Sequence, residues 1–344
     1  MRMMMMVDRR VGSPASLAVL SVGRAPIHAA RTIHPIEGPQ TVLDGPAWRE
    51  AARLSRERVL RLLGGSLDVD GQHPIYNFIF TYYSFDPKLL LRYSPGIGVR
   101  LTGIGVKEKE LWTGRGFASA RGGSGYMDPK LCKASMRRTC RRAAEVMRRT
   151  MTRPPHLNCY GLHEWAMLYQ PAGSRCGLSR YQSLPLRVSQ EALNTVVESV
   201  PIACTHFDAY RFFTKPAVPL NTIRPVPSRE TQLLLEQPGC VHASMDLFRY
   251  SLKLWPWLPS ELLADSLEVA LASRALDMRA SPYDVSQWDG KGFDLQPVCV
   301  ETPEGRRVYQ QEQSRLATRA QSVRSELLRT FEETIAVWDE DDDQ

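Results

Sequence analysis

The stretch KLCKASMRRTCRRAAEVMRR, residues 130–149, indicates which kind of fold this sequence adopts. Cys132, Met136, Cys140, Ala143 and Met147 recur at spacings of three and four residues, while arginines occupy most of the opposite side. This periodicity predicts an α-helix with one buried face and one strongly basic face. The rest of the chain can be interpreted outward from this helix.

Further helical patterns flank this stretch on both sides. Good helix formers run up to a glycine stop in residues 46–64, and a short helix is expected in GLHEWAMLYQ, residues 161–170. Helices are also expected over 240–254 and 260–276, and a final long one begins at residues 302–304, where Thr-Pro-Glu suits a helix start. The sequence therefore predicts a mostly helical fold.

Short strands are expected to complete an α+β fold with a single globular catalytic domain over residues 41–334. The predicted strands cover residues 97–106, 183–188, 195–203 and 296–301. Residues 1–40, rich in Arg, Ser, Ala and Met, suit either a disordered leader or an organellar targeting segment. Residues 335–344 are expected to form a solvated acidic tail.

The composition is that of a soluble globular protein. The chain has 344 residues, of which 43% are hydrophobic and 24% charged. No apolar run approaches the roughly 18 residues that cross a membrane, so no membrane partner is expected. The seven cysteines are odd in number and lack the spacing of a disulfide framework, which favours a reducing, intracellular compartment.

The net charge of +7 is concentrated around the basic helix. This concentration of positive charge suits contacts with DNA phosphates that position a nucleic acid without reading its bases. An ordinary solvated helix face is the alternative. The arginines concerned are Arg137, Arg138, Arg141, Arg142, Arg148 and Arg149.

Three of the seven histidines closely follow a cysteine. Thiolate and imidazole are preferred ligands of zinc, and several of them brought together in space would close a metal site. The alternative is that these are ordinary buried side chains, because cysteine is among the most buried residue types. The candidate ligands are Cys159 and His163, Cys204 and His206, and Cys240 and His242.

Each of these histidines is also followed by a carboxylate, namely Glu164, Asp208 or Asp246. A carboxylate beside an imidazole supplies a base and its orienting partner, as water activation requires. Asp277 is a further candidate, because LDMRASPYD, residues 276–284, can present polar groups to a cleft from a Pro-containing loop. An Asp–Arg salt bridge followed by a turn is the structural alternative for that segment.

Five segments together resemble a bacterial family whose members are commonly labelled 3-methyladenine DNA glycosylase. They are HPIYNFIFTYYSFDP (73–87), GLHEWAMLYQ (161–170), THFDAYRFFT (205–214), EQPGCVHASMDLFRYSLKL (236–254) and LDMRASPYDV (276–285). The resemblance runs from about residue 45 to about residue 325. In the first segment, the aromatic residues are expected to form core, with a base-stacking platform as the alternative.

The resemblance implies a hydrolase that releases alkylated bases from DNA in base excision repair, without a cofactor. A flipped base would enter an aromatic pocket, and Glu164, Asp208, Asp246 or Asp277 would activate water at the glycosidic carbon. The residues expected to bind the substrate are His73, Tyr83, His163, Trp165, Arg211, Arg279, Tyr283 and Asp284.

Two other functions fit the same sequence. The Cys and His pairs favour a metal-dependent enzyme on a small molecule, with zinc or iron as cofactor. The arginines and aromatic residues alone would suit a non-enzymatic nucleic-acid-binding protein, whose binding would be sensitive to salt.

Overall fold

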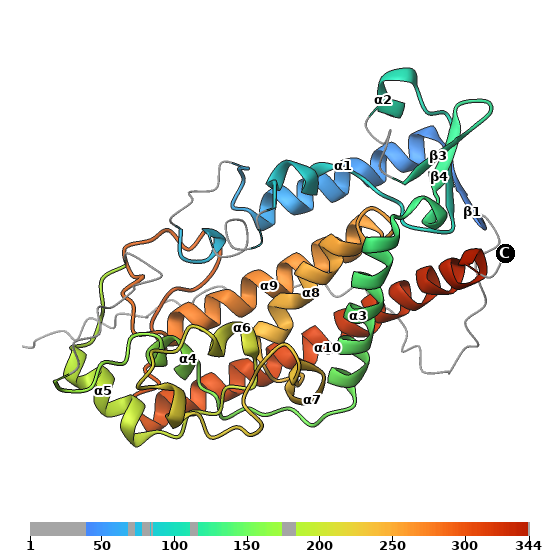
Figure 1. The fold of residues 1–344 in the computed structure, drawn as a ribbon. Helices are drawn as coiled ribbons and strands as arrows, with labels where there is room; N and C mark the ends of the chain where they lie inside the picture. Colours follow the sequence, from blue (N-terminus) through green and yellow to red (C-terminus); the bar gives the residue numbers. More distant parts are fainter. Residues whose placement is uncertain are drawn as a thin grey trace, which may run out of the picture. The chain divides into compact units, whose positions relative to one another are not determined.

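The computed structural model describes residues 39–342 except 68–72, 78–82, 84, 111–115 and 174–183. Helices dominate the fold, and four short strands form one sheet, which confirms the predicted mostly helical α+β class (Figure 1). All of the described residues belong to one compact unit. The predicted leader, residues 1–40, lies outside them apart from its last two residues.

The elements follow one another along the chain, with η marking a 3-10 helix. They are β1 (Thr41–Leu43), α1 (Gly45–Leu62), η2 (Pro87–Leu91), β2 (Val99–Leu101), α2 (Val106–Glu110), β3 (Phe117–Ala120), β4 (Ser124–Met127), η3 (Pro129–Leu131), α3 (Ala134–Met151), α4 (Leu162–Ala166), α5 (Gln190–Ser199), α6 (Phe207–Tyr210), η4 (Val218–Leu220), α7 (Gln232–Leu235), α8 (Val241–Leu254), α9 (Ser260–Ala280) and α10 (Pro303–Asp342).

The centre of the core is the helix pair α8 and α9, against which α10 packs along much of its length (Figure 1). Most side chains of both helices are buried, and Leu247, Phe248 and Leu267 are completely inaccessible to solvent. Burying a side chain of this size stabilises the fold by about 1.5–3 kcal/mol. The two helices therefore form a rigid frame, and the polar residues on them are held inside it.

The sheet has the strand order β1-β2-β4-β3, with β1 parallel to β2 and the remaining pairs antiparallel. Of the predicted strands, 97–106 contains β2, whereas 183–188 contributes only a bridge between Leu186 and Tyr283. Residues 296–301 form no strand. β3 and β4 form a hairpin, with Phe117 paired to Met127 and Ala120 to Ser124.

The predicted strand over 195–203 is wrong for most of its length, because α5 extends to Ser199. The helix begins at Ser189, whose hydroxyl accepts a hydrogen bond from the backbone N–H of Ala192 at 3.2 Å. Its buried side chains are Leu193, Val196 and Val197. This spacing of three and four residues is helical, and burial of that face outweighs the strand preference of the β-branched residues.

The expected acidic tail is likewise corrected, because α10 continues through residues 335–342. Asp341 lies 3.0 Å from the guanidinium of Arg137, and Asp339 pairs with Arg141. The acidic end of α10 is therefore helical, and it lies beside the basic face of α3, whose arginines carry the opposite charge.

A glycine positions the short helix α4. Gly161 has a φ of 69°, and a Cβ at this position would lie 3.2 Å from the Cβ of Ala280. The left-handed conformation disfavours other residues, so Gly161→Ala should lower the free energy of unfolding by about 1–2 kcal/mol. Gly173→Ala is the control, because its φ of 81° is similar but the space around it is open. Urea denaturation should show a smaller loss for the control, and equal losses would contradict crowding at Gly161.

Within the described ranges, no helix combines the length and the apolar character needed to cross a membrane.

Candidate metal centre

Three histidines from separate parts of the chain meet inside the protein. His163 lies on α4, His206 immediately precedes α6, and His242 lies on the first turn of α8. The ring centroids of His163 and His242 are 4.6 Å apart, and those of His206 and His242 are 5.4 Å apart. All three side chains are buried. The histidines of the three Cys-His pairs are therefore brought together.

His163 and His242 form a first group with Asp277, and one ligand atom from each residue lies within 4.8 Å of the others. His163 Nε2 and Asp277 Oδ1 are 2.8 Å apart, but neither atom has a hydrogen-bond partner of acceptable geometry among the described residues. Two ligands of one metal ion, each about 2.1 Å from it, lie about 3 Å apart at an octahedral ion and about 3.4 Å apart at a tetrahedral one, so 2.8 Å is closer to the octahedral spacing. The first group therefore has the spacing of a metal site.

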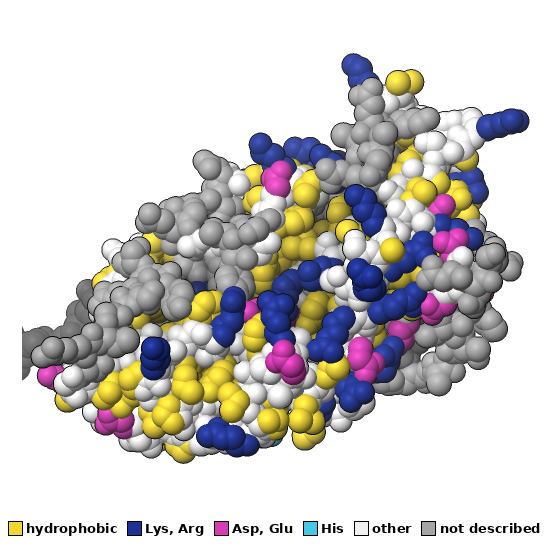
Figure 2. Space-filling model, viewed as in Figure 1, with side chains coloured by type: hydrophobic (Ala, Val, Ile, Leu, Met, Phe, Trp, Pro, Cys, Tyr) yellow, Lys and Arg dark blue, Asp and Glu magenta, His cyan; other side chains and the backbone are white. Residues whose placement is uncertain are grey.

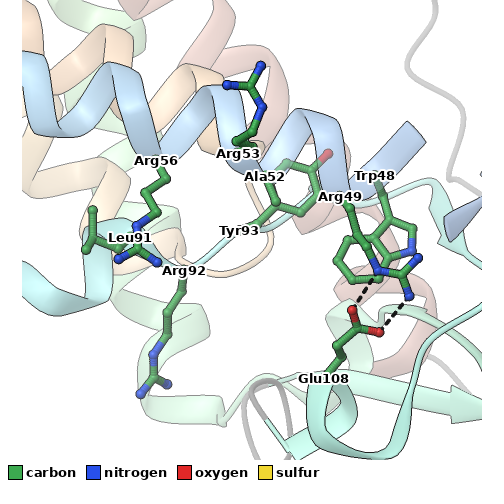
Figure 3. A pocket seen from close by; sticks show the side chains of 9 residues that line it. All are labelled: Trp48, Arg49, Ala52, Arg53, Arg56, Leu91, Arg92, Tyr93 and Glu108. Atoms are coloured by element: carbon green, nitrogen blue, oxygen red, sulfur yellow. Dashed lines mark hydrogen bonds and ion pairs between the residues drawn. The ribbon is translucent and has the colours of Figure 1, made fainter. Parts of the chain in front are cut away.

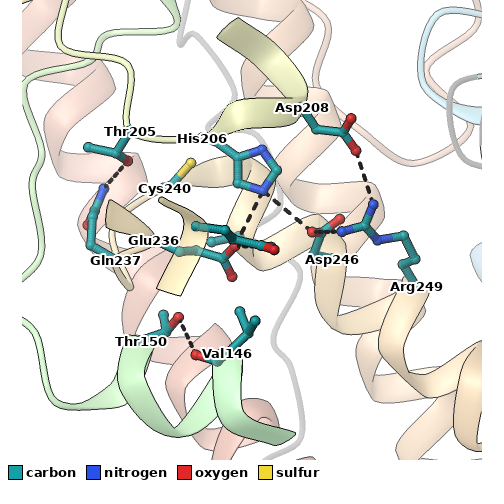
Figure 4. A network of polar contacts seen from close by, with 12 residues as sticks. Val146, Thr150, Thr205, His206, Asp208, Glu236, Gln237, Cys240, Asp246 and Arg249 are labelled. Atoms are coloured by element: carbon teal, nitrogen blue, oxygen red, sulfur yellow. Dashed lines mark hydrogen bonds and ion pairs between the residues drawn. The ribbon is translucent and has the colours of Figure 1, made fainter. Parts of the chain in front are cut away.

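His206 forms a second group with Glu236 and Asp246, again with ligand atoms within 4.8 Å of one another (Figure 4). His206 Nε2 lies 3.4 Å from Asp246 Oδ2 and 3.7 Å from Glu236 Oε2. Neither ring nitrogen of His206 has a hydrogen-bond partner in the described part of the chain. Glu236, at the end of α7, was not predicted, although it opens the quoted segment EQPGCVH.

Two arginines partly neutralise these groups. Arg274 Nη1 lies 2.8 Å from Glu164 Oε1 and 2.7 Å from Asp277 Oδ2, and all three side chains are buried. Arg249 pairs with Asp246 and lies 3.0 Å from Asp208 Oδ2. Each arginine thus serves two carboxylates, so its single charge covers half of the negative charge it contacts. Neither arginine was predicted as part of the site from the sequence. An arginine three residues before Asp277 in an apolar helix does, however, indicate a buried ion pair.

This excess of negative charge raises the pKa values of His163 and His206. Burial disfavours the charged imidazole of His163, but the neighbouring Asp277 outweighs burial and raises the pKa of His163. Burial would raise the pKa of Asp277, yet His163, His242 and Arg274 hold it below its usual range. The pKa of His206 is raised in the same way, because Asp246 and Glu236 outweigh burial. A bound cation would supply the charge that protonated histidines otherwise provide.

The three predicted cysteine ligands lie near the histidines, but none of them belongs to either group of candidate ligand atoms. Burial raises the pKa of Cys204 to about 12, and the Cys204 thiol contacts the backbone oxygen of His206 at 3.5 Å. Burial also raises the pKa values of Cys159 and Cys240, which disfavours the thiolate form that binds metals. A cavity of about 10 Å³, with room for about one water molecule, is lined by Cys159, His163, Cys204, Thr205, His206, Gln237, Cys240, Val241 and His242.

Tyr83 and Arg211 contact carboxylates of the second group or their neighbours. The Tyr83 hydroxyl donates to Asp246 Oδ1 at 3.3 Å, and Arg211 Nε lies 2.8 Å from Asp208 Oδ1. Of the aromatic segment 73–87, the buried Tyr76 belongs to the core as expected, while residues 78–82 and 84 lie outside the described residues.

The other predicted substrate-binding residues serve structural contacts. The buried Trp165 donates its indole N–H to the backbone oxygen of Ala280 at 2.9 Å. His73 Nε2 lies 2.9 Å from the backbone oxygen of Asp289. Arg279 pairs with Asp294 and Glu312. Tyr283 is buried, and Asp284 accepts a hydrogen bond from the backbone N–H of Ser286.

The basic face of α3 is largely paired with acids. Arg148 Nη2 lies 2.8 Å from Glu332 of α10, and Arg149 Nε lies 2.6 Å from Glu145. Figure 2 shows acidic side chains beside the Lys and Arg side chains of this molecular face. Most of the acids that pair with this face lie on α10, which comes from a distant part of the chain. Among the described contacts, Arg138 has no ion pair, and Arg142 contacts only the backbone oxygen of Arg229.

Exposed ion pairs of this kind contribute little to stability. Arg148 is 48% exposed, so Arg148→Ala should lower the free energy of unfolding by less than about 1 kcal/mol. Chemical denaturation at low and high salt would measure this loss. A loss above about 2 kcal/mol would mean that the α3–α10 contact depends on charge rather than on its apolar side chains.

A larger cavity of about 510 Å³ lies beside α1, between Trp48, Arg56, Arg92 and Tyr93 (Figure 3). Its acid, Glu108, lies 2.7 Å from the guanidinium of Arg49. Neither histidine nor cysteine is among its lining residues. The residues with the chemistry expected of an active centre therefore lie around the smaller, buried cavity.

Comparisons with protein-family models, with curated proteins and with solved structures find no match for this chain. The resemblance to proteins labelled as glycosylases, and the activity it implies, therefore stay predictions.

Proposed function

We propose that this protein is a metal-dependent enzyme acting on a small molecule, with a divalent ion held by His163, His242 and Asp277. The observation that carries the proposal is the buried group itself: His163 Nε2 and Asp277 Oδ1 are 2.8 Å apart at an angle poorly suited to a hydrogen bond, and a ring nitrogen of His242 lies within 4.8 Å of both. Buried polar atoms in proteins almost always have a partner. An ion between these atoms would satisfy both.

The donor set favours zinc or iron. Two imidazoles and one carboxylate are the ligands of catalytic zinc sites and of non-haem iron sites, and they leave coordination positions open for a reactant. Magnesium and calcium prefer sites made of oxygen atoms alone. Structural zinc sites use mainly thiolates, whereas neither of the two groups of ligand atoms contains a cysteine among the described residues.

The surrounding residues would orient the ligands. Arg274 binds Asp277 Oδ2 at 2.7 Å, which leaves Asp277 Oδ1 directed toward His163. Arg274 is itself fixed by Glu164 at 2.8 Å. Such outer contacts commonly set the direction and basicity of a metal ligand. Glu164, predicted as a catalytic carboxylate, would then be a positioning residue.

A metal ion here would activate a small ligand at its open positions. Zinc lowers the pKa of a bound water to about 7 and so supplies a nucleophile at neutral pH. Iron with the same ligands binds dioxygen. The cavity of about 10 Å³ has the size of such a ligand.

Elemental analysis tests the proposal on protein purified without an affinity metal column. The wild type should contain at least one zinc or iron per chain, and the double variant His163→Ala, His242→Ala should contain one ion fewer per chain than the wild type. The matched control is His156→Ala, because His156 is exposed and belongs to neither group. Circular dichroism would check that the variants fold. A metal-free wild type, or a folded double variant with full metal content, would overturn the proposal.

The element found decides the activity to assay. Zinc would direct the work to hydrolysis of activated esters and amides, and iron to dioxygen uptake. In either case the double variant should lose the activity and His156→Ala should keep it.

Release of alkylated bases from DNA is the second candidate, supported by the resemblance and by Arg138 and Arg142. These two arginines lack an acidic partner among the described residues, so they remain available for phosphate. Reversing both to Glu should weaken binding to a DNA duplex and flatten its salt dependence by about 0.9 in slope for each phosphate that is no longer neutralised. An unchanged affinity and slope would remove DNA from the partners of this face, whether the protein is an enzyme or only a binding protein.

A further inference from the structure

We propose that a second metal ion binds beside the first, held by His206, Glu236 and Asp246, so that the centre is dinuclear. This inference rests on the proposed function for the neighbouring ion, but its ligands are separate residues. The three side chains are 2–3% exposed, and one ligand atom of each lies within 4.8 Å of the others.

The imidazole of His206 carries the argument. It is 2% exposed, and both of its ring nitrogens lack a hydrogen-bond partner within the described structure. His206 Nε2 approaches both carboxylates, at 3.4 Å from Asp246 Oδ2 and 3.7 Å from Glu236 Oε2. Ligands about 2.1 Å from a tetrahedral ion lie about 3.4 Å apart, so these separations suit an ion between the three atoms.

Both carboxylates are held in place and keep capacity for an ion. Arg249 and Tyr83 contact Asp246 on its two oxygens, and Gln232 donates to Glu236 Oε2 at 2.8 Å. Each carboxylate oxygen has two lone pairs, so one hydrogen bond leaves room for a metal bond at the same atom. Glu236 has no ion pair with an arginine among the described contacts, and an ion would supply the missing positive charge.

The two groups are neighbours. The ring of His242, from the first group, is 5.4 Å from the ring of His206 and nearly parallel to it, with an interplanar angle of 27°. Two ions side by side can stabilise both oxygens of a reacting bond, or hold one small ligand between them. The reactant class that follows is a small oxygen-donor molecule bridging both ions, of which water is the smallest.

Metal stoichiometry tests this inference separately from the proposed function. Chelator-treated protein is reloaded with zinc, and in parallel with ferrous iron under anaerobic conditions. Excess ion is removed by gel filtration, and the ions per chain are counted by elemental analysis. The wild type and the control His156→Ala should retain two ions of the preferred metal, and His206→Ala should retain one.

Each other result counts against the second site in a different way. One ion in the wild type, unaffected by His206→Ala, would overturn the second site and leave the proposed function standing. No ion in the wild type would overturn both. Two ions in His206→Ala would mean that other residues hold the second ion, and loss of both ions would make the two groups a single site. If His206→Ala does not fold, the near-isosteric Glu236→Gln gives the same count.

Discussion

Replacing Arg274 with methionine is expected to lower the free energy of unfolding by about 3–5 kcal/mol, measured by chemical denaturation of the chelator-treated protein. Arg274 is 2% exposed and contacts Glu164 at 2.8 Å and Asp277 at 2.7 Å. Methionine fills a similar volume but leaves both carboxylates buried without this cation. Removal of the metal beforehand prevents a bound ion from masking the loss.

Two variants show whether the loss arises from buried charge. Arg274→Lys keeps the charge but cannot reach both carboxylates in the same planar geometry, so an intermediate loss is expected. Arg319→Met removes an arginine that is 44% exposed and pairs with Glu268, and it should cost less than about 1 kcal/mol. A loss below about 1 kcal/mol for Arg274→Met would contradict the view that Arg274 stabilises this centre.

Metal removal is also expected to lower the stability of the folded protein strongly. An ion that binds only the folded protein stabilises it by about 4 kcal/mol when its concentration is a thousand times its dissociation constant. A chelator should therefore lower the melting temperature of the wild type markedly, and the added ion should restore it. The variant His163→Ala, His242→Ala should show a smaller change in melting temperature on addition of chelator than the wild type. A chelator effect of equal size in both proteins would place the stabilising ion elsewhere.

The helices of the core could be predicted from the sequence because their patterns are local. The predicted helices over 240–254 and 260–276 correspond to α8 (Val241–Leu254) and α9 (Ser260–Ala280). The prediction failed at residues 195–199, where three β-branched side chains suggested a strand. There, burial of one face of α5 decides the structure, and propensity is too weak to oppose it.

The site was predictable only in part. The recurring Cys-His pairs predicted His163, His206 and His242 as site residues, and the rings of these three histidines do lie close together. Cys240 is the residue before the first turn of α8, and it lines the small cavity beside His242 without joining either group of ligand atoms. The carboxylates that join the histidines come from other helices. Asp277, for example, is on α9 and meets His163 across a large sequence separation, which no local pattern reveals.

The arginine face shows the same dependence on distant parts of the chain. The sequence places only Glu145 among these arginines, and their further partners Glu332, Asp339 and Asp341 lie near the C-terminus on α10. Local charge counting could not pair them. The charge that remains for a phosphate is therefore smaller than the sequence of α3 alone indicates.

Anomalous X-ray diffraction from crystals of the zinc- or iron-loaded protein, recorded on both sides of the absorption edge of the metal, would locate the proposed ion. A peak is expected about 2.0–2.2 Å from His163 Nε2 and Asp277 Oδ1, with His242 as a third ligand. A map without a peak at this position, or a peak bonded instead to the sulfur atoms of Cys159, Cys204 and Cys240, would contradict the proposed site.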